Sequence, residues 1–315
     1  MKLRPVTLRD LGFYVRARIN SGISGALNRR RGGSATVAPV ASLDEVLDGA
    51  DTPLALSRLL VGRSNAERQA AVALYLERHG IPFARHAFSS FEGAGENWSV
   101  EIGAGDRVLV LIAHHDAVPG SPGANDNAAA VGILLHLLGR LARTPPANLR
   151  VRLLFTAAEE LGYLGARVYV KDTALASIIG VLSLELCGIG DALAIWDVER
   201  EDDFLQRVGA AVQGVGLRRD ERYHVVGRIP VFGSDHRAFA AAGLPAYGLT
   251  MIPAGAAEAL RRFVLSPGRS ALMHLIRRPR PFDTYHTSGD TYATLEPAAC
   301  DAVVAALHAI IAELG

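Results

Sequence analysis

Two adjacent histidines and two aspartates follow an apolar stretch in the first half of the chain. Residues 108–113 are apolar throughout, which is typical of a strand buried on both faces, and His114, His115 and Asp116 come directly after it. A turn rich in proline and glycine then leads to Asp126, which opens an alanine-rich helical pattern. Because α/β proteins place their chemistry at the carboxyl ends of strands, this loop is a candidate site.

Further polar clusters follow other expected strands. Glu159 and Glu160 form one, Glu185 ends another strand, and Tyr285 and His286 lie in a late loop. Each alone has an ordinary explanation, such as a carboxylate in the first turn of a helix. Together, imidazole and carboxylate groups at the strand ends of one sheet are typical zinc ligands, whereas an all-oxygen set would favour magnesium or calcium.

The charges in such a cluster indicate more than one cation. Carboxylates that crowd to about 4 Å repel one another by roughly 4 kcal/mol per pair at an effective dielectric of about 20. Such a site is strained or partly protonated when it holds no cation. Two divalent cations would balance three carboxylates and one hydroxide, so the residue types predict a pair of metal ions.

The elements that must position these residues alternate between strands and helices. Strands are expected at residues 97–103, 107–113, 149–157, 177–186, 191–197 and 244–251. Helices are expected at residues 64–80, 126–142, 159–170, 202–213, 234–243 and 296–314. The pattern predicts an α/β fold, a three-layer sandwich in which a mixed, centrally parallel sheet is flanked by helices.

Composition narrows the class of protein. The 315 residues are 50% hydrophobic and 21% charged with a net charge of +1, which allows one large core or two small ones and gives no reason to expect a nucleic acid partner. The two cysteines do not make a disulfide framework, and a cytoplasmic location is the default expectation. Charged residues, proline or glycine interrupt every long apolar run, so no transmembrane segment is expected.

Residues 1–50 are predicted to be a basic N-terminal extension, and residues 51–315 a catalytic domain. The first 33 residues contain eight basic residues and one acidic residue, and their charges interrupt any secretory signal. We interpret the extension as a solvated or loosely docked arm. The alternative is an amphipathic basic segment that contacts an anionic surface or a partner.

The order of these motifs resembles that of the co-catalytic dizinc aminopeptidases, metallopeptidase family twenty-eight, whose relatives include glutamate carboxypeptidase II and the glutaminyl cyclases. The resemblance covers roughly residues 55–315 and rests on five motifs in order. They are a His-x-Asp motif after a strand, a Gly-Ala-x-Asp turn, a Glu-Glu pair, an acid at a strand end and a Tyr-His-Thr motif. The resemblance implies the zinc-dependent exopeptidase fold and two Zn²⁺ per chain, with Co²⁺ or Mn²⁺ as alternatives.

The resemblance also assigns the metal ligands. His114, Asp126 and Glu185 would bind one zinc, and Asp126, Glu160 and His286 would bind the other, so that Asp126 bridges the two ions. Three protein ligands per ion leave a position for a shared water, as in catalytic zinc sites. Glu185 stands where the family usually has Asp, which puts metal affinity rather than mechanism in question.

The remaining roles concern residues beside the ligands. Glu159 corresponds to the general base, and Asp116 would orient a metal-bound group. Tyr285 corresponds to a tyrosine that supports the oxyanion, with an aromatic residue at the rim of the site as the alternative. Asp235 and His236 are interpreted as structural residues at the start of a helix.

The function implied is removal of N-terminal amino acids from peptides or small amides that carry a free amino terminus. One alternative is a single-zinc glutaminyl cyclase chemistry, although the cyclases have Trp where this chain has Tyr285. The other alternative is a metal-free binding module of the same fold. Residues 251–283 are interpreted as a packed helical insert. We hypothesise that it forms part of the specificity wall over the site and that its arginines favour acidic or C-terminally anionic substrates.

Overall fold

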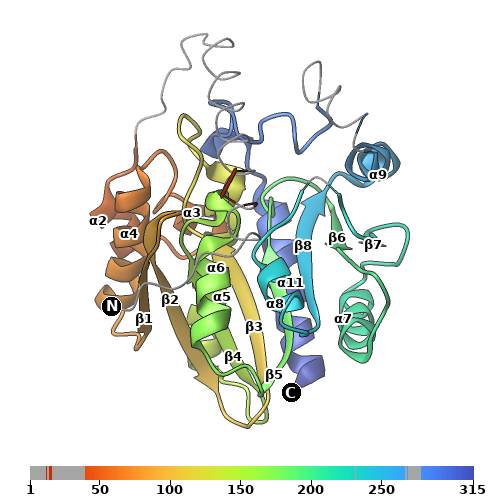
Figure 1. The fold of residues 1–315 in the computed structure, drawn as a ribbon, viewed down its shortest axis with the longest axis horizontal. Coiled ribbons are helices and arrows are strands. Elements are labelled where there is room, and N and C mark those ends of the chain that lie inside the picture. The colour runs from red at the N-terminus through yellow and green to blue at the C-terminus, as the bar shows by residue number, and fades with distance from the viewer. Residues whose placement is uncertain (1–11, 13, 16–39, 231, 267, 269–277) are drawn as a thin grey trace.

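The core of the protein is one eight-stranded sheet between two layers of helices (Figure 1). The computed structural model describes residues 12, 14–15, 40–230, 232–266, 268 and 278–315. In spatial order the strands are β1 (Ala84–Ser89), β2 (Ala94–Gly103), β4 (Arg150–Thr156), β3 (Val108–His114), β5 (Ile178–Leu184), β8 (Ala246–Ile252), β6 (Ala192–Trp196) and β7 (Tyr223–Val225). The strands β4, β3, β5 and β8 run parallel, while β1 and β2, β2 and β4, and β6 and β8 pair antiparallel. The predicted mixed, centrally parallel sheet is confirmed.

Helices cover both faces of the sheet. One layer is built from α2 (Leu43–Gly49), α3 (Pro53–Ser57), α4 (Asn65–Arg78), α5 (Ala129–Arg143), α7 (Asp203–Gly214) and α11 (Pro297–Leu314). The other contains α6 (Leu164–Asp172), α8 (His236–Ala240) and α9 (Ala257–Leu265). Along β3, Leu109 and Leu111 pack into the first layer, while Val110 and Ile112 pack into the second. This alternation explains why β3 is apolar at every position.

One described helix, α11, is long and apolar enough to cross a membrane by length and composition alone. Half of the helix is buried, and it packs against α5 and α7. Burial of this kind is also found in the core helices of globular domains, so the expected absence of a transmembrane segment stays a prediction.

Three local expectations differ from the structure. Packing begins before residue 51, because Val46 and Leu47 of α2 are each 3% exposed and belong to the main core. The strands β1 and β7 were not predicted. Residues 159–170 do not form one helix, since a 3₁₀ turn ends at Leu161 and α6 starts only at Leu164.

The interruption before α6 has a packing cause. Gly162 and Tyr163 both have positive φ values, of 78° and 61°, so the backbone leaves the right-handed helical conformation between the two helical pieces. Gly165 then lies against the backbone of Ala157, where a Cβ would collide with the carbonyl oxygen. Close packing of α6 on the end of β4 therefore takes precedence over the continuity of the helix.

Candidate metal centre

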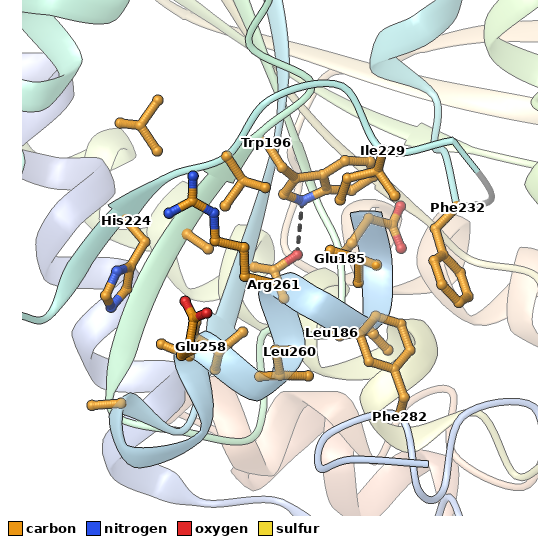
Figure 2. A pocket seen from close by; sticks show the side chains of 18 of the residues that line it. Glu185, Leu186, Trp196, His224, Ile229, Phe232, Glu258, Leu260, Arg261 and Phe282 are labelled. Atoms are coloured by element: carbon orange, nitrogen blue, oxygen red, sulfur yellow. Dashed lines mark hydrogen bonds between the residues drawn. The ribbon is translucent and has the colours of Figure 1, made fainter. Parts of the chain in front are cut away.

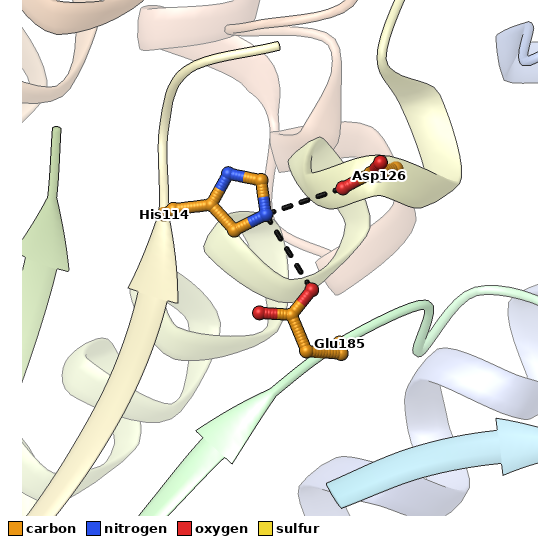
Figure 3. Close-up of side chains that lie close together, drawn as sticks. All are labelled: His114, Asp126 and Glu185. Atoms are coloured by element: carbon orange, nitrogen blue, oxygen red, sulfur yellow. Dashed lines mark ion pairs between the residues drawn. The ribbon is translucent and has the colours of Figure 1, made fainter. Parts of the chain in front are cut away.

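The first group of candidate ligands lies where the neighbouring parallel strands β3 and β5 end. His114 is the last residue of β3, and Glu185 directly follows β5. His114 Nε2 lies 3.2 Å from Asp126 Oδ1 and 3.4 Å from Glu185 Oε2 (Figure 3). All three side chains are buried, and their ligand atoms lie within 4.8 Å of one another.

The second group shares Asp126 with the first. His286 Nε2 lies 3.1 Å from Asp126 Oδ2 and 3.1 Å from Glu160 Oε2. The two carboxylate oxygens of Asp126 therefore face different histidines. The structure thus brings together all five residues expected to be ligands, in two sets of three that meet at one carboxylate.

The turn that carries Asp126 is held from two sides. Asp290 accepts hydrogen bonds from the backbone nitrogens of Asn125 (2.8 Å) and Asp126 (3.1 Å). On the other side, the Asn127 side chain donates to the carbonyl oxygen of Leu184 at 2.7 Å, which connects the turn to β5. The Asp126–Asn127 peptide bond is cis. These contacts place Asp126 between the strand ends.

Asp116 connects His114 to the Glu159–Glu160 pair. Its carboxylate accepts hydrogen bonds from the backbone nitrogens of Glu159 (3.0 Å) and Glu160 (3.1 Å). Its backbone carbonyl lies 3.1 Å from His114 Nδ1. A carbonyl oxygen can only accept, so Nδ1 carries the proton and, in the neutral imidazole, Nε2 offers its lone pair to the site.

Glu185 is oriented by serines from two elements. Ser234, before α8, donates a hydrogen bond to Glu185 Oε1, and Ser234 Oγ lies 2.9 Å from Ser183 Oγ. With Oε1 engaged in this way, Oε2 points toward His114. Glu185, whose side chain is one methylene longer than the aspartate that the resemblance implies, is therefore fixed at Oε1.

Without bound cations, the protein's own charges keep the histidines protonated. Burial lowers the pKa of His286, but Glu160 and Asp126 outweigh it and raise the pKa to about 10. His114 behaves in the same way, because Glu185, Asp116 and Asp126 raise its pKa well above 6.5 despite burial. The carboxylates around the two histidines thus favour a positive charge at each imidazole.

Glu159 and Tyr285 border the centre without belonging to either ligand set. Burial, reinforced by Glu185, Glu160 and Asp235, raises the pKa of Glu159 well above 4.5, with His114 opposing. A carboxyl group with a raised pKa is suited to take up and return a proton. The Tyr285 ring stacks on His286 with centroids 3.7 Å apart, and burial raises its pKa well above 10, so its hydroxyl stays a neutral donor.

The donor set fits zinc. Two imidazoles and three carboxylates converge on one buried volume, and Glu160 Oε1 has no hydrogen-bond partner among the described residues. A buried acceptor without a partner is costly, and a bound cation would satisfy it. Mixed nitrogen and oxygen donors in sets of three match the composition of catalytic zinc sites.

Several supporting residues were missed in the sequence. Asp290 follows the Tyr-His-Thr motif by three residues and could have been noticed for that reason. Arg68 lies on the same face of α4 as the buried Val72 and Tyr75, and a charged residue on an apolar face is a signal. The structure places Asp235 and His236 outside both ligand sets, as expected, with Asp235 accepting from Thr156 and His236 facing Asp197.

A cavity of about 570 Å³ opens beside the centre (Figure 2). Glu185 and Tyr285 line it on the side of the ligands. Its apolar wall is formed by Trp196, Ile229, Phe232, Leu260, Val264 and Phe282. Glu258, Arg261 and His224 lie at the other end of the cavity in Figure 2. The cavity connects the candidate ligands to a mostly apolar space large enough for a side chain.

The arginines of residues 251–283 are used in different ways. Arg262 pairs with Glu258 at 2.8 Å, Arg280 pairs with Glu296, and Arg278 donates to the Tyr285 carbonyl oxygen at 2.6 Å. Two more, at positions 269 and 277, lie outside the described residues. Among described arginines, only Arg261 lines the cavity. The expected helical insert is represented by α9 in the described part of this segment.

Comparisons with known proteins agree with this geometry. Residues 97–311 match the sequence profile of "Peptidase family M28". The aminopeptidase YwaD of Bacillus subtilis is 40% identical over 63 residues, which are 20% of this chain and 14% of that protein. A zinc aminopeptidase structure from Bacillus subtilis aligns with a TM-score of 0.56 at 19% identity, covering 72% of this chain and 52% of the other.

A glutaminyl cyclase structure from an Acidobacteriales bacterium aligns over more of its length. Its TM-score is 0.59 at 19% identity, and the alignment covers 86% of this chain and 91% of the cyclase. The first curated relatives are matched over less than a fifth of their length, 18% and 14%. At such identities the structural likeness shows the fold, which is that of the zinc-dependent exopeptidases.

Proposed function

Since this chain belongs to peptidase family M28, we propose that it is a zinc-dependent aminopeptidase that removes N-terminal amino acids from peptides. The observation that carries the proposal is the shared carboxylate of Asp126, whose two oxygens face His114 and His286 at 3.2 and 3.1 Å. A carboxylate with a three-residue set on each side is suited to hold two ions, and a structural site for one ion needs no such bridge.

Two Zn²⁺ per chain would be held by the two ligand sets, one by His114, Asp126 and Glu185, the other by Asp126, Glu160 and His286. When bound, such ions lower the pKa of a water toward about 7 and polarise the carbonyl group of a substrate. Asp116 keeps His114 Nε2 directed at the site through the hydrogen bond at Nδ1.

Glu159 acts as the general base in this proposal. It is 8% exposed, directly precedes the ligand Glu160, and has a pKa raised by burial and by neighbouring carboxylates. Its carboxylate takes a proton from the attacking water, and the resulting carboxylic acid returns that proton to the departing amine. The neutral Tyr285 hydroxyl donates a hydrogen bond to the oxygen of the substrate carbonyl as negative charge develops there.

The free amino terminus of the substrate is bound by carboxylates. A protonated α-amino group entering the site meets Glu160, Glu185 and Glu159, which lie around the shared Asp126. A charge-assisted hydrogen bond to such a group is stronger than one between neutral partners. An acidic site of this kind therefore favours amino-terminal residues over internal peptide bonds.

The test combines metal content with activity. Purified protein is expected to carry two zinc ions per chain by elemental analysis and to hydrolyse aminoacyl anilides. Removal of zinc with a chelator is expected to abolish hydrolysis, and added Zn²⁺ or Co²⁺ is expected to restore it. A protein with one zinc that cyclises N-terminal glutamine peptides would instead support the glutaminyl cyclase alternative, and a protein without zinc or turnover would support a binding module.

Zinc affinity is expected to rise with pH. The pKa of His286 is raised to about 10 and that of His114 lies well above 6.5, so both imidazoles carry protons at pH 7 that zinc must displace. Each displaced proton makes the affinity rise by about tenfold per pH unit below the folded pKa. Competition with a chelator between pH 6 and 8 measures the slope, after correction for the chelator's own protonation. A zinc affinity that does not change with pH would contradict protonation of His114 and His286 at neutral pH.

The cavity is expected to select apolar N-terminal residues. Its described lining contains four carboxyl groups, Glu185, Asp220, Glu221 and Glu258, against one guanidinium, Arg261. This balance disfavours the acidic substrates that the arginine content of residues 251–283 suggested. Since a methylene group in an apolar pocket is worth about 1–3 kcal/mol, leucine and phenylalanine anilides are expected to exceed alanine and glutamate anilides in kcat/KM by about tenfold or more.

The contribution of Arg261 can be separated from that of the wall. Arg261→Ala is expected to lower kcat/KM for the glutamate anilide only, while Arg280→Ala, a change at an arginine that pairs with Glu296 outside the cavity lining, leaves all substrates unchanged. A glutamate anilide that is turned over faster than the leucine anilide would restore the acidic preference.

A further inference from the structure

Arg68 is among the largest fully buried side chains in the described protein, although it belongs to neither ligand set. It projects from α4, a helix of the first layer, which packs into the main core through Val72 and Leu76. Arginine is almost never fully buried unless its donors are satisfied. What satisfies Arg68 therefore indicates what it does.

The guanidinium of Arg68 donates to four backbone carbonyl oxygens. Its Nε donates to His115, one terminal nitrogen donates to Leu60 (3.2 Å) and Pro122 (3.1 Å), and the other donates to Gly123 (3.2 Å). These carbonyls come from three separate segments: the loop before α4, the residue that follows β3, and the turn that leads to Asp126. One planar group thus fixes the relative positions of all three.

Two of these segments carry the ligands. His115 lies between His114, a ligand of the first set, and Asp116, whose carboxylate holds the backbone of the Glu159–Glu160 pair. Gly123 is three residues before Asp126, the ligand common to both sets. The bonds from Arg68 therefore join the loop with the first ligand to the turn with the shared one.

The packing around Gly123 at this junction is tight. Gly123 has a φ of 65°, and a Cβ there would lie 2.7 Å from a guanidinium nitrogen of Arg68 and 2.8 Å from the Cβ of Ala117. One turn earlier on α4, the Asn65 side chain exchanges two hydrogen bonds with the backbone of Ala117, at 3.0 and 2.9 Å. Asn65 and Arg68, in the first two turns of α4, thus both hydrogen-bond to the backbone of residues 115–123.

Arg68 also supplies positive charge near the candidate metal ligands. Burial lowers its pKa to about 10, while Asp116, Asp126, Asp290 and Glu160 act in the opposite direction. The side chain is therefore a cation at neutral pH. Its attraction to these four carboxylates opposes the mutual repulsion that would otherwise push the ligand loops apart.

We propose that Arg68 is a positioning residue of the metal centre, which sets the spacing between the His114 loop and the Asp126 turn through its four backbone hydrogen bonds. The proposal rests on the proposed function, because it takes the two ligand sets to be metal sites. Outer partners of this kind typically contribute about 10–100-fold to metal affinity. A merely structural role would lower stability and leave affinity unchanged.

The experiment uses the full chain with two changes at position 68 and one matched control. Arg68→Met removes the charge and the donors, whereas Arg68→Lys keeps a charge but cannot reach four carbonyls. Leu76→Ala, on the same helix and fully buried, lowers stability without touching either loop. Zinc affinities are measured by competition with a chromophoric chelator, the visible absorption of the Co²⁺ forms reports ligand geometry, and melting temperatures report stability.

The Met variant is expected to bind both zinc ions about 10–100-fold more weakly and to show a changed Co²⁺ spectrum. The Lys variant is expected to lie between it and the unchanged protein, while Leu76→Ala melts earlier but keeps both affinities. Should Arg68→Met fail to fold, Arg68→Lys and Asn65→Ala provide the same comparison. Unaltered affinities and spectra in the variants, with two zinc ions in the parent protein, would overturn the positioning role alone. A parent protein that binds no zinc would overturn the proposed function and this inference together.

Discussion

Replacing Glu159 with glutamine is expected to abolish most turnover while leaving two zinc ions in the protein. The substitution preserves the shape of the side chain but removes its ability to take up a proton. General base catalysis typically contributes about 10²–10⁴-fold to rate, so kcat for a leucine anilide should fall within that range. The fall should appear in kcat rather than KM, because proton transfer occurs in the transition state.

The two adjacent glutamates make this prediction specific. Glu160 Oε2 lies 3.1 Å from His286 Nε2, whereas Glu159 belongs to neither ligand set. Glu160→Gln is therefore the matched variant, and it is expected to weaken zinc binding at the His286 site. The zinc content of both variants, measured by elemental analysis, shows which glutamate is the ligand. Loss of zinc from Glu159→Gln with retention in Glu160→Gln would mean that the two roles are exchanged.

Replacing Asp126 with asparagine is expected to remove both zinc ions and their stabilising effect. The two oxygens of Asp126 face His114 and His286, and among the described residues Asp126 is the one ligand that both sets share, so this change affects both sets at once. An amide keeps the shape but loses the negative charge and presents a nitrogen to one of the ions. A ligand at a hundredfold excess over its Kd stabilises a fold by about 2.7 kcal/mol, and this gain should vanish in the variant.

Asp235→Asn is the control for that experiment. Asp235 is also fully buried near the centre, but its described contacts are with Thr156 and the Ser234 hydroxyl rather than with the ligand histidines. This variant is expected to keep both ions and the shift in melting temperature on zinc addition. Retention of two zinc ions by Asp126→Asn would disprove a bridging carboxylate, and loss of only one would indicate two independent sites.

The sequence alone predicted the parallel centre of the sheet, although not β1 and β7, and together with the family resemblance it supplied the candidate ligands. Residues 108–113 of β3 are continuously apolar, and β4 and β5 carry shorter apolar runs, because these parallel strands are covered on both faces. That local feature can be read without knowing which strands are neighbours. Chain polarity then places the residues after each run at one edge of the sheet. For this reason His114 and Glu185, which are separated by 71 positions, could be assigned to one site.

The tertiary structure decided how those residues are held. Asp290 binds the Asn125 and Asp126 amides across 165 and 164 positions of sequence, and Arg68 reaches His115 across 47. Contacts of this kind depend on which loops meet after folding, and no local pattern encodes them. The break before α6 has the same origin, because the packing of Gly165 on Ala157 overrides a sequence that favours one continuous helix.

What the sequence determined and what the tertiary structure decided differ in the length of chain over which each feature arises. Apolar periodicity and polar residues at strand ends are properties of short segments, so the sequence by itself determined the fold class and the chemical types of the site. The distances from the two carboxylate oxygens of Asp126 to the imidazoles of His114 and His286 depend on contacts between α4, the strand ends and the 278–290 loop. Only the assembled protein sets those distances, and they are what make one aspartate common to two ligand sets.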